Sequence, residues 1–196
     1  MAKPVAQSIG SSQSAQDKAT YYVQQIGIVV GVSLFVALCA RVTIPLPFTP
    51  VPLTVQNFGV LLVGLLLGSR RGFAAMALYL AEGAAGLPVF NPLGVGGVAQ
   101  LFGPTGGYLM AYPFVAFLAG YIFEGGAKSF LRAAVAGVIG EIVLFAGGLG
   151  WLYIVTHSLA KAVFLGLYWF LAAEVMKVMF AAAIATRWKS RSVSRR

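Results

Sequence analysis

Long apolar runs separated by short breaks dominate the chain from residue 24 onwards. A helix needs roughly 20 mostly apolar residues to cross the hydrocarbon core of a bilayer. The runs predict six transmembrane helices: Gln24–Ala40, Thr54–Gly68, Gly72–Gly86, Thr105–Phe123, Leu131–Val155 and Leu159–Thr186. The predicted fold class is therefore an all-α integral membrane protein.

Polar segments flank this apolar region at both ends. Residues 1–23 are rich in Ser, Gln and Ala and lack the apolar core of a signal peptide, so they predict a disordered cytoplasmic tail. Residues 24–187 form the six-helix substrate-binding domain, and residues 188–196 form a basic cytoplasmic tail. The short loops leave no room for a second domain.

The charge distribution fits a membrane protein better than a nucleic-acid-binding protein. Charged residues make up only 10% of the chain, whereas soluble domains carry about 25%. The net charge of +9 comes from basic residues at the ends of apolar runs, where they set orientation. With the N-terminus inside, the outer side holds only Arg41 and Lys161, which predicts that both termini are cytoplasmic. The inner side holds Lys3, Lys18, Arg70, Arg71, Lys128, Arg132, Arg187, Lys189, Arg191, Arg195 and Arg196.

Two loops on the predicted outer side have an unusual composition. The first contains Pro45, Pro47, Pro50 and Pro52, which exclude a helix or a central strand and favour a stiff, extended segment. The second, residues 86–107, carries no charge. Non-helical backbone near a membrane persists where it is buried in protein or lines a cavity. We expect both loops to cover the outer mouth of the bundle; the alternative is that they lie among the lipid headgroups.

Four charged residues fall inside the predicted spans and are functional candidates by default: Glu82, Glu141, Glu174 and Lys177. Lys177 precedes Arg187 by ten residues, which places it roughly 15 Å from the inner surface, near the midplane. Glu174 and Lys177 share a helix face at i, i+3 spacing. They either neutralise each other or form the polar floor of a site whose aromatic wall is the run 168–170.

Several uncharged polar residues are secondary candidates. Tyr79 lies three residues before Glu82, and its hydroxyl either contacts a ligand or bonds a neighbour. Gln56 and Asn57 begin the second span and Asn91 lies in the second outer loop, where each can bind a ligand or cap a helix or turn. Glu141 can pair with Lys177 across the bundle or face another polar partner, and we favour a structural role for it.

Sequence patterns for catalysis are missing. The chain has no Walker motif, no His-Glu-x-x-His, no Gly-x-Ser-x-Gly and one cysteine, Cys39. We therefore predict no catalytic residue, no metal ligand and no cofactor. Small residues recur at fourfold spacing, as in Gly27-Ile-Val-Val-Gly31 and Gly64-Leu-Leu-Leu-Gly68, and serve packing within the bundle or docking to a partner.

Three motifs in the same order resemble the BioY family. They are the run from Ile44-Pro-Leu-Pro through Thr54-Val-Gln56-Asn to Gly68, then Gly86-Leu-Pro-Val-Phe, then Gly103-Pro-Thr-Gly-Gly-Tyr-Leu. The resemblance covers about residues 24–186. Glu174 and Lys177 are similar to the family's acidic residue and lysine, although Asp is more usual than Glu. A second departure is Asn91-Pro-Leu-Gly, which replaces a glycine-richer run.

The resemblance implies a six-helix S component of an energy-coupling factor (ECF) transporter in the bacterial plasma membrane. Such a subunit binds biotin from outside with high affinity and docks onto a transmembrane coupling subunit and ATP-binding-cassette ATPase subunits. It implies biotin contacts from Glu174 and Lys177, and we add Gln56, Tyr79 and Asn91 as expected ligand-binding residues. Glu174 can accept from the ureido N–H groups, while Lys177 can donate to the ureido oxygen or to the carboxylate.

Three other functions remain as alternatives. The first is a membrane enzyme that uses Glu174 and Glu141 as acid and base, which lacks any nucleophile or metal motif. The second is an ATP-independent carrier, disfavoured by the lack of an internal inverted repeat. The third is an S component for a different vitamin.

Overall fold

The computed structural model describes residues 4–193, with side chains described for residues 18–189. Residues 1–3 and 194–196, the outermost parts of the two predicted tails, lie outside this range. The described elements are α1 (Pro4–Arg41), β1 (Thr43–Ile44), β2 (Leu53–Thr54), α2 (Gln56–Leu67), α3 (Ser69–Ala84), α4 (Gly97–Phe102), α5 (Gly106–Glu124), α6 (Phe130–Thr156), α7 (Leu159–Val163), the π-helix η1 (Phe164–Tyr168) and α8 (Leu171–Val193).

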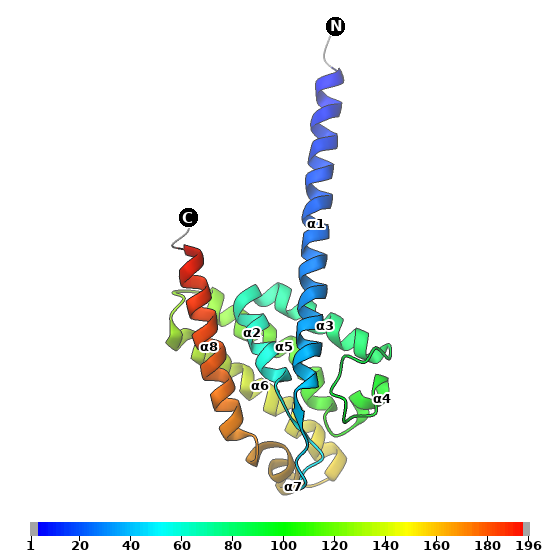
Figure 1. Cartoon of the computed structure of the whole chain (residues 1–196), viewed down its shortest axis with the longest axis vertical. Helices are drawn as coiled ribbons and strands as arrows, with labels where there is room; N and C mark the ends of the chain where they lie inside the picture. The colour runs from blue at the N-terminus through cyan, green and yellow to red at the C-terminus, as the bar shows by residue number, and fades with distance from the viewer. Residues whose placement is uncertain (1–3, 194–196) are drawn as a thin grey trace.

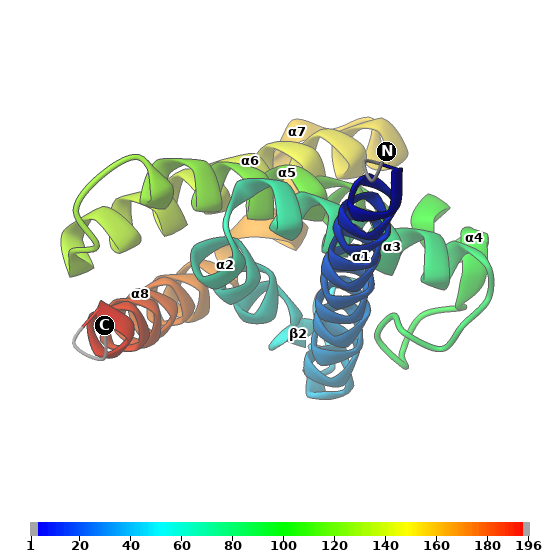
Figure 2. The same ribbon diagram turned by 90° about the horizontal axis from the view of Figure 1, so that it is seen from above.

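The fold is a helical bundle with α2 and α5 at its centre. Helix α5 packs against α6, α3 and α2, and α2 also contacts α1 and α8. Seen from above, α2 lies between α1 and α8, and α5 and α6 run along one side of these three helices (Figure 2). The start of α1 and the end of α8 lie on one side of the molecule, and α7 lies on the opposite side (Figure 1).

Within the part of the chain that the structure describes, three helices are long and apolar enough to cross a membrane by themselves: Lys18–Arg41 within α1, Gly106–Glu124 and Phe130–Thr156. A fourth candidate is the pair Leu159–Tyr168 and Leu171–Lys189, which is bent by 46°. Helices α2 and α3, with 12 and 16 residues, lie where spans two and three were predicted. At 1.5 Å per residue they are about 18 and 24 Å long, shorter than the hydrocarbon core of about 30 Å.

Two sequence predictions need correction. The sixth span, expected over Leu159–Thr186, is not one regular helix, because its first part widens into η1 before α8 begins. The second outer loop, expected to be irregular, contains the short helix α4. The division into two tails and a central domain stays a prediction, although α1 is already helical from Pro4 onwards.

The first outer loop is tied at its base by a minimal hairpin. Thr43 pairs with Thr54 and Ile44 with Leu53, so the four prolines lie between the strands, as their missing N–H groups require. The hairpin therefore returns the chain to the start of α2 directly beneath the loop.

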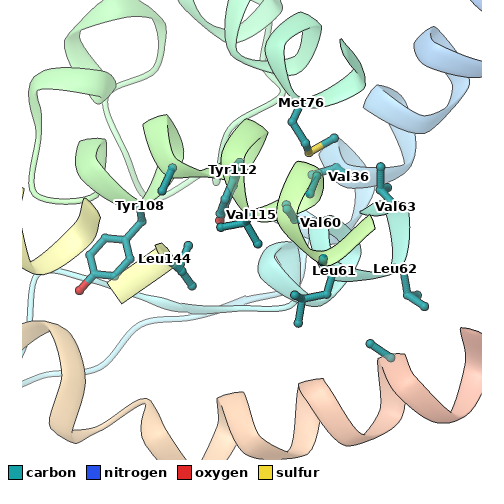
Figure 3. Packing of buried hydrophobic residues seen from close by; sticks show 14 of the residues in the cluster. Val36, Val60, Leu61, Leu62, Val63, Met76, Tyr108, Tyr112, Val115 and Leu144 are labelled. Carbon is teal, nitrogen blue, oxygen red and sulfur yellow. The ribbon is translucent and has the colours of Figure 1, made fainter. Parts of the chain in front are cut away.

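Apolar side chains from the central helices fill the core. Val60 and Leu61 of α2, Met76 of α3 and Val115 of α5 are fully buried, and they converge in Figure 3. Val36 adds the contribution of α1. This core holds α2 rigidly, which matters because α2 carries two of the polar residues described below.

The α2–α3 turn depends on Gly68. Its φ of 89° lies in the left-handed region that glycine adopts without strain. A β-carbon there would collide with the carboxylate of Glu124, which accepts a hydrogen bond from Ser69 Oγ at 2.8 Å. The end of α5 thus locks this turn.

The end of α5 is capped by two cations. Lys128 Nζ donates to the carbonyl oxygens of Phe123 and Glu124, and Arg132 Nε donates to that of Ile122. These bonds satisfy carbonyl groups that a helix end leaves unpaired. Burial lowers the pKa of Lys128 below its usual value, and the positive charge of Lys189 lowers it further, because the end of α8 lies nearby.

The structure separates the two small-residue patterns. A β-carbon on Gly64 would lie 2.5 Å from the carbonyl oxygen of Ala116, whereas Gly27 and Gly31 have nothing within 4 Å of that position. The pattern in α2 therefore serves packing within the bundle, and the pattern in α1 faces open space.

We predict that Gly64→Ala destabilises the protein and that Gly31→Ala does not. The added methyl group at residue 64 must push α2 away from α5, and such overpacking costs about 1–3 kcal/mol. Thermal unfolding of the purified variants in the same detergent measures the difference. Equal melting temperatures for both variants would contradict the close approach of α2 and α5.

Candidate functional site

An inner cavity of about 50 Å³ lies among α2, α5, α6, η1 and α8. Both outer loops contribute to its lining, as expected of a cover: Val51, Pro52 and Thr54 from the first and Asn91 from the second. The remaining lining residues are Gln56, Asn57, Thr105, Tyr108, Leu109, Tyr112, Leu144, Phe145, Gly166, Phe170, Glu174 and Lys177.

The predicted pair in α8 forms one wall of this cavity. Lys177 Nζ donates to Glu174 Oε1 at 2.7 Å, and the two side chains are 14% and 8% exposed. The i, i+3 spacing on a helix brings the two groups together. Mutual neutralisation of the pair is therefore observed, and because both residues line the cavity, their role as the polar floor of a ligand site stays a prediction.

Asn57 connects this pair to Glu141. Its Nδ2 donates to Glu174 Oε2 at 2.8 Å and to Glu141 Oε1 at 2.6 Å. Glu141, expected to pair with Lys177 or with another polar group, is thus bonded to Asn57 of α2. The four side chains form a continuous network across α2, α6 and α8, which we call the acidic network.

Gln56 lines the cavity next to Asn57, and Tyr79 supports it from behind. Gln56 Nε2 donates to the Tyr79 hydroxyl at 2.7 Å, which donates to the carbonyl oxygen of Val89 at 2.8 Å. Tyr79 is fully buried but is not among the cavity's lining residues. It therefore holds Gln56 and anchors the start of the second outer loop.

Asn91, the fifth predicted residue, lies in that loop and lines the cavity. Its Oδ1 accepts from the backbone N–H of Leu93 at 3.1 Å, a local turn that fixes the side chain. The structure thus brings Gln56, Asn91, Glu174 and Lys177 around one cavity and sets Tyr79 one layer behind.

Sequence reasoning missed several lining residues. Asn57 was considered as a hydrogen-bonding or capping residue but was not among the five expected ligand-binding residues. Tyr108 was noted only as part of the third family motif and Tyr112 not at all, although both line the cavity from α5. Their i, i+4 spacing on one face of an otherwise apolar span was the available signal. Figure 3 shows both side chains on the Leu144 side of the core.

The three aromatic residues 168–170, just before α8, have different surroundings. Phe170 is buried and lines the cavity, whereas Tyr168 is exposed. Trp169 packs on Phe48 of the first outer loop, with ring centroids 4.0 Å apart. Only one of the three rings is therefore a wall of the site.

The π-helix η1 holds the first outer loop in place. Its carbonyl oxygens at Leu165 and Gly166 accept from Thr49 Oγ1 at 2.6 Å and from the Tyr108 hydroxyl at 2.7 Å. Such single π turns occur frequently at functional sites. Together with the contact between Phe48 and Trp169, the bond from Thr49 holds the first loop against the end of the bundle.

A second, outer cavity of about 400 Å³ lies between the two loops. It shares Pro52, Asn91 and Thr105 with the inner cavity. Small-molecule sites usually enclose about 300–1,000 Å³, so the inner cavity alone is too small for a typical ligand. The shared residues form the partition between a narrow polar floor and a wider outer chamber.

Within the described residues, no group of three or more His, Cys, Asp or Glu side chains could hold a metal ion. The cavity lining offers one ammonium donor together with carboxylate, amide and hydroxyl groups, enclosed by aromatic and aliphatic walls.

Comparison with known proteins gives consistent matches. The model of the BioY family matches residues 11–193. The chain is 37% identical over 158 residues to the probable biotin transporter BioY of Pyrococcus horikoshii, covering 80% of this chain and 92% of that protein. It is 39% identical over 152 residues to the biotin transporter BioY of Thermotoga maritima, covering 78% and 89%.

A solved structure supports the same relationship. The structure of the S-component for biotin from an ECF-type ABC transporter superposes with a TM-score of 0.78 at 26% identity. The match covers 87% of this chain and 93% of that one. The helical arrangement described above is thus that of an ECF S component.

We predict that Tyr79→Phe lowers the stability of the protein. The variant leaves Gln56 Nε2 and the Val89 carbonyl oxygen buried without their shared partner, which costs about 1–3 kcal/mol. In a chain of this size, each kcal/mol lowers the melting temperature by about 2–4 °C. The control is Tyr121→Phe, because Tyr121 is 64% exposed. An unchanged melting temperature for Tyr79→Phe would show that its hydroxyl has no supporting role.

Proposed function

The chain belongs to the BioY family, and on that premise we propose that it is the membrane subunit that captures biotin for an ECF-type uptake transporter. The observation that carries the proposal is the Glu174–Lys177 pair on the wall of a cavity that both outer loops cover. Relatives named as biotin transporters favour biotin over a different vitamin, and as transporters they point away from an enzyme.

The chemistry of the cavity suits the ureido end of biotin. That ring presents two N–H donors beside a carbonyl acceptor, whereas the other end of biotin is a carboxylate. The acidic network holds two carboxyl groups and one ammonium group, so a second anion beside it meets repulsion. We therefore place the ureido ring at the network, with its oxygen toward Lys177 Nζ and an N–H toward Glu174.

The remaining parts of biotin fit the other walls. Tyr108, Tyr112 and Phe170 offer apolar and aromatic surface to the fused rings. Gln56 and Asn91 supply further hydrogen-bonding groups, and Tyr79 acts through Gln56. Because the inner cavity is smaller than a bicyclic ligand, binding requires the partition at Pro52, Asn91 and Thr105 to move so that the two cavities join.

Family membership and the apolar helices make the chain a multi-pass membrane protein. For its topology we propose six crossings, with α2 and α3 as short second and third crossings and α7–η1–α8 as the bent sixth. Both termini would face the cytoplasm of a bacterial cell, because the basic residues concentrate at that side. The biotin site then opens outward, beneath the two loops.

Energy for uptake must come from other subunits in this proposal. The sequence has no nucleotide-binding motif, and the matching solved structure belongs to an ECF-type ABC transporter. We therefore propose as partners a transmembrane coupling subunit and ATP-binding-cassette ATPases. Capture itself needs only the two joined cavities and their polar groups.

The central prediction is that purified full-length protein binds labelled biotin tightly without ATP and that Lys177→Ala loses this binding. Truncating one partner of a buried ion pair costs about 2–5 kcal/mol, which weakens affinity by roughly 30- to 5,000-fold. Equilibrium dialysis measures the dissociation constants of the wild type and of Lys177→Ala for biotin. Lys161→Ala is the matched control, since Lys161 is exposed at the start of α7. Wild-type affinity in Lys177→Ala would refute the site, and no binding by the wild type would refute the function.

A labelling experiment tests the orientation. In a Cys39→Ala background, we expect a membrane-impermeant maleimide to label Val95→Cys on intact cells, because residue 95 is 79% exposed in the second outer loop. Ser129→Cys, in the turn between α5 and α6, should react only after permeabilisation. The reverse pattern would place the termini outside.

A further inference from the structure

Two unpaired atoms in the acidic network are the starting point. Among the described side chains, the buried polar atoms without a hydrogen-bond partner are Asn57 Oδ1, Glu141 Oε2 and Gln100 Nε2. Two of the three belong to one bonded pair, and Asn57 and Glu141 are only 3% and 8% exposed. Leaving a buried acceptor unpaired is costly, so proteins rarely do so without a reason.

The two carboxylates determine which way the Asn57 amide points. Its nitrogen donates one hydrogen to Glu141 Oε1 and the other to Glu174 Oε2. Exchanging the amide oxygen and nitrogen would set a carbonyl oxygen against two carboxylate oxygens and lose both bonds. Oδ1 is therefore held on the far side of the amide from the carboxylates. Asn57 lines the cavity, and because its nitrogen is fully used, Oδ1 is the hydrogen-bonding atom of this side chain that remains without a partner.

Glu141 occupies a different position. It is absent from the lining of the inner cavity and instead lines an apolar groove of about 530 Å³ between α6 and α8. Glu174 lines both this groove and the inner cavity. The hydrogen bond of Glu141 is to Asn57, so the Asn57 amide is the hydrogen-bonded route from Glu141 to the cavity lining.

We propose that Asn57 is a specificity-determining residue whose Oδ1 accepts a hydrogen bond from a ureido N–H of biotin, and that Glu141 is a positioning residue that fixes the Asn57 amide. This inference rests on the proposed function. Glu174 and Asn57 then serve as the two acceptors for the two ureido N–H groups, and Lys177 serves as the donor to the ureido oxygen. The three together select a cyclic urea.

The site favours a cyclic urea through these hydrogen bonds, and it also disfavours ligands that lack one of the N–H groups. A ring oxygen in place of the N–H presents lone pairs to Asn57 Oδ1, whose orientation Glu141 and Glu174 prevent from reversing. A site built to bond a donor rejects an otherwise similar ligand that lacks it, because the buried acceptor stays unpaired.

The test compares biotin with its two cyclic carbamate analogues, in each of which one ureido N–H is replaced by a ring oxygen. Their dissociation constants are measured with full-length protein in nanodiscs. One of the two carbamates carries its ring oxygen where biotin presents an N–H to Asn57. We expect wild type to bind this carbamate more weakly than biotin by on the order of 10- to 100-fold. Asn57→Leu should bind biotin more weakly by a similar factor and show no preference for biotin over that carbamate.

The Glu141 variants test the positioning role. Glu141→Gln keeps a carbonyl oxygen that can accept from Asn57 Nδ2, so it should keep the discrimination between biotin and the carbamate. Glu141→Leu removes that acceptor and should reduce the discrimination several-fold. A merely structural Glu141 would change thermal stability in Glu141→Leu without changing this ratio.

The control is Ser33→Ala, which breaks a partly buried hydrogen bond, from Ser33 Oγ to Glu82 Oε2, between residues that do not line the cavity. This variant should keep the wild-type ratio between the dissociation constants for the carbamate and for biotin. If Asn57→Leu still prefers biotin over the carbamate as strongly as wild type does, the inference is wrong. Biotin binding by wild type would in that case leave the proposed function intact. If Asn57→Leu does not fold, the Glu141 pair decides, since equal ratios in Glu141→Gln and Glu141→Leu overturn it. Failure of wild type to bind biotin overturns both.

Discussion

The structure depends on one requirement: a lysine deep in the bundle must have its charge compensated. A lysine at the centre of a membrane helix costs about 2.5–3.5 kcal/mol on insertion scales. Here Lys177 is satisfied by Glu174 on its own helix, and Glu174 is in turn bonded to Asn57 of α2. Compensation therefore extends across helices, and α2 and α8 must keep their relative positions for it to last. The tight contact of α2 with α5, at Gly64, helps to secure that position.

The rest of the site is arranged around this constraint. The minimal hairpin begins α2 beneath the first loop, Tyr79 joins Gln56 to the second loop, and η1 accepts hydrogen bonds from Thr49 and Tyr108. The first loop is thus bonded to η1, which carries a wall of the cavity, and the second loop is linked through Tyr79 to Gln56 on another wall. Movement of the cover and rearrangement of the floor are consequently coupled through short, identifiable contacts.

The sequence predicted the helical membrane class, the approximate positions of the helices and the pairing of Glu174 with Lys177, because apolar run length and i, i+3 spacing are local properties. It did not predict the bond between Asn57 and Glu141, since depth along a helix says nothing about which helix lies opposite. For Tyr79 the sequence left open a ligand contact or a bond to a neighbour; the structure shows the bond to Gln56, and the ligand contact stays a prediction. The widening at η1 was also missed, because Phe-Leu-Gly-Leu-Tyr fits an ordinary helix equally well.

That widening has an evolutionary consequence. A π turn holds more residues than an α turn, so losing one residue within Phe164–Tyr168 can restore a regular helix while Glu174 and Lys177 keep their angular position. The carbonyl groups that now accept from Thr49 and Tyr108 would then return to bonds along the helix axis. Single-residue insertions and deletions at this point are therefore a route by which evolution can change how the first outer loop closes over the cavities. The residues that recognise the ligand would stay the same.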